Sequence, residues 1–508
     1  MSRKEDFFMA PSLSAGSLSG GVELSPDATY RSLQTKYMDF SLPQASVCFG
    51  LNNTTLKSIA ADMVVNDISI ELTCGFEASI ARFRIYNVYD SSTGQFRYSA
   101  LKKHLYMGNS LSISMGYAGK LETVFVGFVA GVSFGYQRGD LPYIEVSGMD
   151  AKGIMMAGGY ACQLTADNYA DAVSEILRRT AYEELKRSGA IRDIKVTATP
   201  DVDPSLLTAM QAQEAAQAAA ENAQAAASAA RKAAEASGST EALAKAAELE
   251  AAAQAAQSAV EAALNTFNQA KQALAATKAA VEEATSAIAE ASAAGIPATV
   301  PVPSGPVSDY TMEMAAESDY EFVVKAAKKF NYEFFVDRGV VYFRKAKSVK
   351  APVAELSSNG GILNFNIEYS INGIVGSVEA RAMDPGQGKI ISSKSTFSNT
   401  ISTNGMAKTL TKDGRKVLID PTIGTTTQAE SRVSSLMEQM SYRLGSLEAE
   451  CVGLPELAPG RFLRVSGLGE PVDNDFYLTT VVHEYRDDTG FLTRVTGKAD
   501  QIKGGGIL

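Results

Sequence analysis

Apolar and polar residues alternate in short runs in the first and last thirds of the chain. Residues 68–73 read ISIELT and residues 111–115 read LSISM, and single glycines separate such runs. A period of two places one face of a β-strand in a core and the other in solvent or against a partner. Glycine between the runs is typical of turns and bulges. The pattern predicts β-structure over residues 35–160 and again over residues 351–500.

Three helices are predicted beside these β regions. The first covers residues 169–186 and the last residues 428–442. Between them, Ser318 and Glu321 form the S-x-x-E pattern of a capping box, in which each side chain accepts a backbone N–H of the first helical turn. Apolar residues with helical spacing then continue to Phe330. Two apolar runs after this helix, separated by Asp-Arg-Gly, predict a β-hairpin over residues 332–344.

The composition changes abruptly between residues 204 and 294, where alanine alternates with Glu, Gln, Lys and Ser. Alanine is the best helix former because it loses no side-chain entropy. Pro204 after an aspartate is typical of a helix start, and Gly295 before Ile-Pro is typical of a helix end. Ser-Gly-Ser-Thr at residues 237–240 predicts a turn between two helices.

The second of these helices carries a heptad repeat. Large apolar residues recur every seven positions, and Ala or Thr follows three residues after each. Large side chains at one core position and small ones at the other predict a narrow coiled-coil seam. The seam residues are Val260, Phe267, Leu274, Val281 and Ile288. The alternative is a loosely helical low-complexity segment, since few large apolar residues are available for burial. A membrane-lying helix is disfavoured because the polar face is acidic and Gln-rich.

Short motifs recur in the same order in both β regions. LxxGxxLxI at residues 105–113 matches LxxGxxLxV at 457–465, VFV at 124–126 corresponds to FYL at 476–478, and residues 143–148 match residues 492–497. The repetition predicts two tandem, similar small β-barrels. A trimer of such chains would present six quasi-equivalent barrels in a ring, which could meet sixfold symmetry on one side and threefold symmetry on the other.

The fold class predicted is therefore mainly β with α: two similar β-barrels, an α/β connecting region and a long inserted coiled-coil hairpin. The predicted segments are a loose arm (1–34), a first barrel (35–160), a helical connection (161–203), the Ala-rich insertion (204–296), a linker and α/β region (297–350), a second barrel (351–500) and a flexible tail (501–508).

Composition narrows the classes of function. The 508 residues are 45% hydrophobic and 20% charged, which suits a folded, soluble protein of several domains. A net charge of −10 argues against a nucleic-acid-binding surface as the main purpose. The four cysteines are far apart and form neither a zinc pattern nor a disulfide framework. No signal peptide or membrane span is recognised, so we expect synthesis and folding in the cytoplasm.

No residues for catalysis, cofactor binding or metal binding stand out. The two histidines, His104 and His483, have no second histidine or cysteine nearby in sequence, and a structural or surface role is the simpler interpretation for each. Phosphate-binding and nucleophile-elbow motifs are absent. We expect adjacent carboxylates, such as Glu282 and Glu283, to be solvated rather than a glycosidase pair. The chain is predicted not to be an enzyme.

Residues from about 60 to 500, without the insertion, resemble the late control protein D family of phage tail hubs, and are similar to the hub part of VgrG-like type VI secretion spike proteins. The resemblance rests on three groups of motifs: MGNSL, VFVGF and EVSGMD at residues 107–150; SDYEF and YEFFV at residues 318–336; and LAPG to VSGLG at residues 457–469, followed by Tyr477 and His483.

The resemblance implies a baseplate component: a homotrimer below a hexameric tail tube, holding a spike and passing force to it on contraction. It implies contacts with other baseplate proteins, no cofactor, and no membrane insertion before contraction. Because no further barrel follows residue 508, we expect the spike to be a separate chain. The resemblance does not separate a phage, a tailocin, an extracellular injection particle and a type VI system, and it does not explain the insertion.

Two other interpretations remain. A coiled-coil adhesin or adaptor with two β domains would be a monomer or dimer without a tube-binding face. A cell-wall hydrolase would place a carboxylate pair in a cleft.

Overall fold

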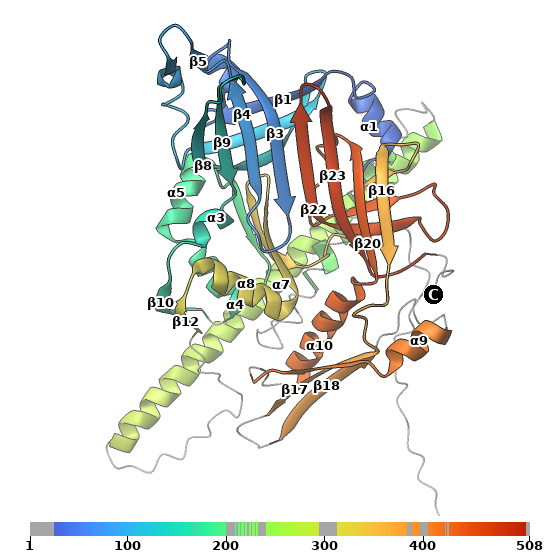
Figure 1. The fold of residues 1–508 in the computed structure, drawn as a ribbon. Helices are drawn as coiled ribbons and strands as arrows, with labels where there is room; N and C mark the ends of the chain where they lie inside the picture. The colour runs from blue at the N-terminus through green and yellow to red at the C-terminus, as the bar shows by residue number, and fades with distance from the viewer. Residues whose placement is uncertain are drawn as a thin grey trace, which may run out of the picture.

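The computed structural model describes residues 25–166, 168–199, 240–293, 312–383, 389–396, 405–421, 423 and 426–503, with part of residues 209–231. Its main feature is a 13-stranded sheet assembled from both ends of the chain (Figure 1). The first half contains β1 (Pro43–Phe49), β2 (Thr54–Thr55), β3 (Val64–Thr73), β4 (Ile80–Tyr86), β7 (Ser110–Tyr117), β8 (Lys120–Gly135) and β9 (Tyr143–Met149). The second half contains β15 (Pro352–Leu356), β16 (Ile362–Tyr369), β20 (Gly445–Val452), β21 (Phe462–Val465), β22 (Asn474–Arg486) and β23 (Gly490–Ala499).

One strand pair joins the two halves. Residues 480–485 of β22 pair antiparallel with residues 68–73 of β3. A single cluster of buried apolar side chains extends across the junction, with Ile70 and Phe83 from the first half and Leu447 and Phe476 from the second, all fully buried. The halves therefore share one hydrophobic core.

The two halves repeat the same order of strands. The first runs β3-β4-β9-β8-β7-β1 and the second runs β16-β20-β23-β22-β21-β15. The long hairpins correspond in detail, because β8 has a bulge between Val129 and Gly131 and β22 has one between Leu478 and Thr480. The outer strands differ, since β1 is antiparallel to β7 whereas β15 is parallel to β21. Whether each half closes into a small barrel is not tested by these pairings and stays a prediction.

The registers correct one of the three sequence matches. Gly148 and Gly497 lie opposite Val129 and Leu478, directly beside the equivalent bulges, so the match ending in these glycines agrees with the structure. The expected match of residues 124–126 with 476–478 is wrong. The pairing places residues 127–129 where residues 476–478 lie in the second half. A β-bulge and hairpins of different length shift the register between copies, and short apolar motifs cannot reveal that shift.

A smaller α/β unit packs beside the sheet. It contains β10 (Tyr160–Leu164), α4 (Tyr169–Ile176), α5 (Thr180–Ser188), β11 (Asp193–Val196), β12 (Met312–Glu317), α8 (Asp319–Phe330), β13 (Tyr332–Asp337) and β14 (Val340–Lys345). β11 pairs parallel with β14, which forms the expected hairpin with β13. The capping box is present at α8, where Ser318 and Glu321 accept each other's backbone N–H.

Two expectations for this unit need correction. The helix expected over residues 169–186 is two helices, because the chain turns after α4 and Arg179 adopts an extended conformation before α5. The helical connection expected over residues 161–203 also contains β10 and β11, whose partners come from β12 and β14, far away in sequence. Local residue propensities cannot predict pairing between strands so far apart in the sequence.

A second α/β unit interrupts the predicted barrel of residues 351–500. It lies between β16 and β20 and contains β17 (Ser377–Met383), β18 (Ile390–Thr396), α9 (Gly405–Lys412), β19 (Arg415–Ile419) and α10 (Thr426–Ser441). α10 packs Ala429 and Val433 against Val378 and Ala380 of β17, in a core separate from that of the main sheet. The helix expected over residues 428–442 is therefore confirmed as α10, but the sheet beneath it was not expected.

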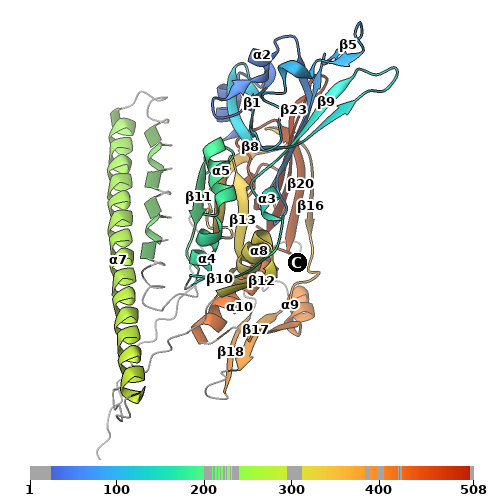
Figure 2. The ribbon, with the colours of Figure 1, turned by 90° about the vertical axis from the view of Figure 1, so that its left-hand side faces the viewer.

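The Ala-rich insertion is helical where the structure describes it. α7 (Thr240–Ala293) runs along one side of the molecule, next to the helical residues described between 209 and 231 (Figure 2). Arg231 Nη1 lies 3.1 Å from Glu250 Oε1 and links the two helices. α7 begins at the end of the predicted turn. The predicted stop at Gly295 and the linker expected from residue 297 lie outside the described residues.

Short elements complete the first half. They are α1 (Tyr30–Lys36), α2 (Leu56–Ile59), β5 (Tyr89–Asp90), β6 (Gln95–Phe96), η1 (Tyr98–Ala100) and α3 (Lys152–Met155). α1 is capped by Thr29 and buries Leu33 in the main core. The loose arm expected over residues 1–34 therefore ends before α1, and residues 1–24 lie outside the described part.

Phe83→Ala tests the shared core. Phe83 is fully buried on β4, so its truncation leaves a cavity, and we expect the free energy of unfolding to fall by about 3–5 kcal/mol. The measurement is urea unfolding followed by far-UV circular dichroism, because the chain has no tryptophan. Met107→Ala is the control; Met107 is 71% exposed, and a change within about 0.5 kcal/mol is expected. Equal effects of the two substitutions would contradict the assignment of the core.

Candidate functional site

The predicted coiled-coil seam lies on α7. Buried or half-buried side chains recur there at intervals of three and four residues: Ala246, Leu249, Ala253, Ala256, Val260, Ala263, Phe267 and Ala270. Glu250 is also half-buried, beside Arg231. The side chains of Leu274, Val281 and Ile288 lie outside the described residues, so the full seam stays a prediction.

The two histidines lie in different surroundings. His104 is half-buried in the turn that precedes β7. His483 is fully buried on β22, where its Nδ1 lies 3.0 Å from Thr493 Oγ1 on β23. Leu454 donates its backbone N–H to the same Thr493 hydroxyl, which leaves the hydroxyl proton available to His483 Nδ1. This arrangement suits a neutral imidazole held inside the core.

Burial lowers the pKa of His483 to about 3, and the nearby positive charge of Arg338 acts in the same direction. The neutral form is therefore the folded form throughout the physiological range. Because the pKa lies far below 7 and the side chain is inaccessible, His483 is suited to packing rather than to proton transfer or metal binding.

A second buried polar group joins the α/β unit to the sheet. Glu333 of β13 accepts a hydrogen bond from Arg344 Nε at 2.6 Å and another from the hydroxyl of Tyr477 on β22. Burial raises the pKa of Glu333, while Arg344 and the Tyr477 hydroxyl oppose the rise. Sequence reasoning missed this group, since its members lie far apart in the chain and only the packing of β13 on β22 brings them together.

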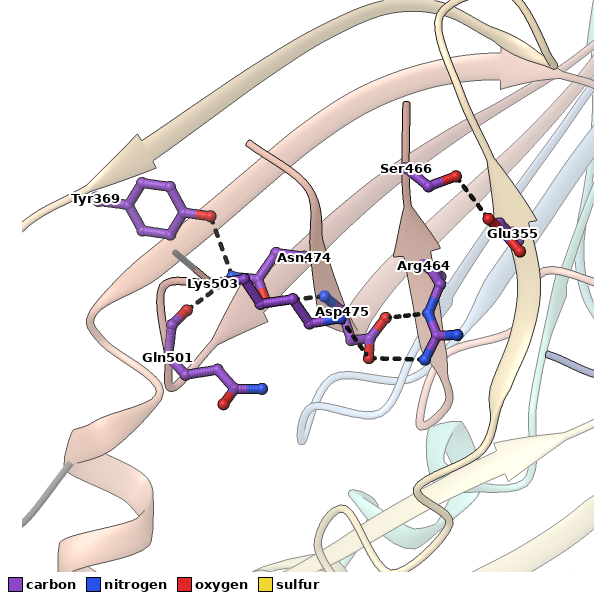
Figure 3. Close-up of polar contacts among 8 residues, drawn as sticks. All are labelled: Glu355, Tyr369, Arg464, Ser466, Asn474, Asp475, Gln501 and Lys503. Atoms are coloured by element: carbon purple, nitrogen blue, oxygen red, sulfur yellow. Dashed lines mark hydrogen bonds and ion pairs between the residues drawn. The ribbon is translucent and has the colours of Figure 1, made fainter. Parts of the chain in front are cut away.

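A third polar group ties the ends of β16, β21 and β22 (Figure 3). Asn474 donates from Nδ2 to the Tyr369 hydroxyl at 3.1 Å and to the Gln501 carbonyl at 2.7 Å. Tyr369 donates its hydroxyl to the Pro471 carbonyl at 3.1 Å. Arg464 binds both carboxylate oxygens of Asp475, at 2.8 and 3.1 Å. The group positions Tyr369, the last residue of β16.

A groove of about 1810 Å³ lies between the helical hairpin, formed by α7 and the helical residues described between 209 and 231, and the face of β13 and β14. Four carboxylates line it, and each lies beside a partner: Glu456 is 2.9 Å from Lys36 Nζ, Asp27 is 2.5 Å from Arg461, Glu438 accepts from Asn331 at 2.8 Å, and Asp337 is 3.8 Å from Arg338 Nε. Asp337 Oδ1 is buried without a hydrogen bond, and burial raises the pKa of this carboxyl group. Paired carboxylates are typical of structural contacts rather than of an acid and base in a hydrolase cleft.

Within the described ranges, no group of three or more His, Cys, Asp or Glu residues could hold a metal ion. No helix in the part of the chain described here is long and apolar enough to cross a membrane. The four cysteines are free thiols, of which Cys74 and Cys451 are buried.

The most unusual surface features are two strand edges. The β8 edge comprises residues 131–136, the end of β8 and the residue after it, and exposes Phe134 (48%) and Tyr136 (63%). The β16 edge is β16 itself and exposes Leu363 (55%) and Phe365 (40%). Exposed apolar strand edges promote association, and monomeric proteins usually protect them. These edges, rather than a pocket, are the candidate functional site.

Two solved structures have a similar fold. The tail protein from Neisseria meningitidis MC58 has a TM-score of 0.51 and is 11% identical, covering 91% of this chain and 98% of that chain. The 43 kDa tail protein of prophage MuSo2 from Shewanella oneidensis has a TM-score of 0.50 and is also 11% identical, covering 90% and 98%. The chain therefore has the fold of these tail proteins.

The comparisons by sequence match a smaller part of the chain than the comparison by fold. A family model described as the Alg8 N-terminal domain matches residues 302–487, less than half of the chain. The matched segment extends from β12 to the end of β22 and includes the SDYEF motif. No curated protein matches the chain in sequence.

His483→Gln tests the buried imidazole. The folded-state pKa is depressed, so the stability that depends on the neutral ring is complete above about pH 6.5 and falls as the pH drops toward 3. At pH 5 this dependence amounts to about 2 kcal/mol. We expect His483→Gln to reduce the loss of unfolding free energy between pH 7.5 and pH 5 by about that amount, measured by urea unfolding at each pH.

Val481→Ala is the matched control, because it removes buried volume from the same strand without removing a titrating group. It should lower stability at both pH values and keep the wild-type difference between them. An unchanged pH dependence in His483→Gln would contradict the buried neutral imidazole.

Proposed function

We propose that the chain is a structural, non-enzymatic hub of the baseplate in a contractile, phage tail-like injection machine. In this proposal three copies form a ring that joins a hexameric tail tube on one side to a separate trimeric spike on the other. The ring passes axial force from tube to spike on contraction. The single observation that carries the proposal is the repeated strand order in the two halves of the main sheet.

The repeat matters because the proposed hub lies between a tube of sixfold symmetry and a spike of threefold symmetry. Three chains with two similar halves each supply six related surfaces, so one threefold assembly can contact a sixfold tube. The halves are not identical, as the parallel pairing of β15 and the antiparallel pairing of β1 indicate, and the assembly keeps threefold symmetry for the spike. The fold shared with two tail proteins supports the same proposal.

A rigid connection between the halves suits the transmission of force. Axial load on one half reaches the other through six paired residues of β22 and β3 and through the core beneath them. The Glu333–Arg344–Tyr477 group, in which Glu333 and Tyr477 are buried, links the α/β unit to the same strand. A load-bearing hub also needs a permanent interface between copies, and such interfaces bury more than about 2,000 Å².

The Ala-rich helical hairpin that contains α7 is proposed to be a coiled coil outside the ring. Its half-buried positions at three- and four-residue intervals support a seam that continues through Val260 and Phe267. Ala at the alternate positions allows close approach of the two helices. Arg231 and Glu250 form an ion pair within the hairpin. In this proposal the outer face of the helical hairpin contacts other baseplate proteins.

The mass of the full chain in solution tests the proposal. We expect light scattering after size exclusion to give a mass near three times 53.8 kDa at micromolar concentration. Replacing residues 204–296 by a short Gly-Ser linker should leave the trimer intact, because the proposed ring is built from the sheets. A stable monomer or dimer of the full chain, with no shift on adding tube or spike protein, would overturn the hub and favour an adaptor.

A further inference from the structure

The internal repeat leaves two strand edges without the partner that their counterparts have. The second half of β22 has β23 on one side and β3 on the other. Its counterpart in β8, residues 131–135, has β9 on one side and no strand on the other within the described residues. The counterpart of β3 is β16, which has β20 on one side and, in the same described part, no strand on the other.

The equivalence can be fixed residue by residue on the β8 side. Gly131 and Thr480 are the first paired residues after the equivalent bulges, and they lie opposite Ser147 and Thr496, each of which precedes the motif glycine. Counting on from there, Val132 corresponds to Val481 and Phe134 to His483.

The equivalence between β16 and β3 follows from the registers of the strands beside them. Gly148 and Gly497 lie opposite Ala81 of β4 and Leu447 of β20. In turn Ala81 lies opposite Ile70, and Leu447 lies opposite Ile367. Ile367 therefore corresponds to Ile70 of β3. The next pairs outward agree, since Ser69 and Asn366 lie opposite the equivalent Arg82 and Glu448.

A detail of the outer face supports this alignment. Arg84 Nε lies 2.9 Å from Glu145 of the opposite strand, and Arg494 Nε lies 2.8 Å from Glu450. These two ion pairs occupy equivalent positions with the charges exchanged between the strands. The two halves therefore match in side-chain contacts as well as in strand order.

We propose that the β8 edge of one copy pairs antiparallel with the β16 edge of a second copy, in the register of the internal β22–β3 junction. Within the chain, Val481 lies opposite Leu72, His483 opposite Ile70 and Tyr485 opposite Ile68. Transferred to the free edges, Val132 pairs with Tyr369, Phe134 with Ile367 and Tyr136 with Phe365. This inference rests on the proposed ring and names the surfaces that close it.

The exposure of these side chains agrees with the register. In the internal junction Val481, His483 and Ile70 are fully buried and Leu72 is 3% exposed. On the free edges the corresponding side chains are apolar as well, but Phe134, Tyr136 and Phe365 are 40–63% exposed. Pairing the edges places an aromatic or aliphatic side chain opposite each of them, as favourable cross-strand pairs require. A second copy supplies the missing half of each pair.

Both edges are held in place before any partner arrives. Phe134 packs edge-on against Phe96 and Tyr98, with ring centroids 5.3 Å apart in each case, and Tyr136 lies 5.4 Å from Tyr89. On the other edge Tyr369 is anchored by Asn474 (Figure 3), and its hydroxyl donates to the Pro471 carbonyl. The tip of the β8–β9 hairpin extends away from the body (Figure 2), where it can reach a neighbour. Preorganised edges lose little conformational freedom on pairing.

The contact is head-to-tail, because the β8 edge and the β16 edge are different surfaces of the chain. A head-to-tail contact closes into a ring when its rotation divides a full turn. Since the internal junction uses the same two kinds of edge in the same direction, six similar steps alternate within and between three chains. No sheet edge of this kind then remains open, which removes the aggregation hazard of a long apolar edge.

Cysteine cross-linking tests the register. Ser133 and Glu368 are both exposed and are predicted to lie directly opposite, with their Cα atoms about 4.5–5.5 Å apart, within disulfide range. In a Cys162→Ser background, Ser133→Cys with Glu368→Cys should give covalent dimers and trimers on mild oxidation. Ser133→Cys with Asn364→Cys is the control; Asn364 lies further along β16, and this pair should give at least tenfold less cross-linked product.

Phe134→Asp tests whether pairing of the two edges stabilises the trimer. A buried aspartate opposite Ile367 opposes pairing. In the free chain residue 134 is 48% exposed, so we expect the fold to tolerate the loss of its contacts with Phe96 and Tyr98. We expect the trimer to dissociate at concentrations at least tenfold higher than for the wild type, with an unchanged circular dichroism spectrum. Met383→Asp, at a residue 64% exposed on β17, should keep the wild-type mass.

The outcomes separate the two proposals. A trimer that resists Phe134→Asp, or that cross-links equally in both cysteine pairs, overturns the edge pairing and leaves the hub intact. A chain that stays monomeric with added tube and spike protein overturns the hub itself, and the edge pairing with it. A trimer with cross-linking specific to Ser133 and Glu368 supports both.

Discussion

The antiparallel pairing of β22 with β3 holds the two halves of the main sheet together. It joins residues 480–485 to residues 68–73, which stand at opposite ends of the chain. The core of the first half and the core of the second become one cluster across it. The two α/β units and the helical hairpin lie between these strands in sequence, so each is held in a loop whose ends the junction brings together. Long-range antiparallel pairing of this kind carries a large entropic cost of loop closure, offset by the burial of apolar side chains on both sides.

The same junction indicates what kind of partner the β8 edge and the β16 edge would fit. A strand edge with exposed aromatic side chains is a liability in a monomer, and proteins usually blunt such edges with charges, prolines or covering loops. Here Phe134 and Phe365 remain exposed at positions whose counterparts are covered inside the chain. The chain thus contains one example of the contact and the two unpaired halves of another. This asymmetry between filled and open positions is a physical argument for assembly that does not depend on resemblance to other proteins.

The buried polar groups fit a structural part better than a catalytic one. His483 is kept neutral inside the sheet, Glu333 is bonded to Arg344 and Tyr477, and Asn474 joins three strand ends. Each connects elements that would otherwise meet only through apolar contacts, although His483 Nε2 is buried without a hydrogen-bond partner. Such groups make the relative placement of elements specific, because a buried polar atom is stable in only one arrangement. Specific placement is what the proposed load-bearing ring would require.

Much of the local structure could be predicted from the order of the residues. The capping box at Ser318, the hairpin of β13 and β14 and the long helix α7 follow from side chains close in the chain, and so do the alternating strands. Which strands are neighbours emerged from the tertiary structure. It split the helix expected over residues 169–186, placed an α/β unit between β16 and β20, and moved the expected match of residues 124–126 to residues 127–129. The candidate interface could not be predicted either, since alternation marks Phe134 and Phe365 as apolar strand positions without telling whether a strand of the same chain covers them. Strand partners and registers depend on contacts between residues hundreds of positions apart, whereas helix caps and turns depend on residues within a few positions.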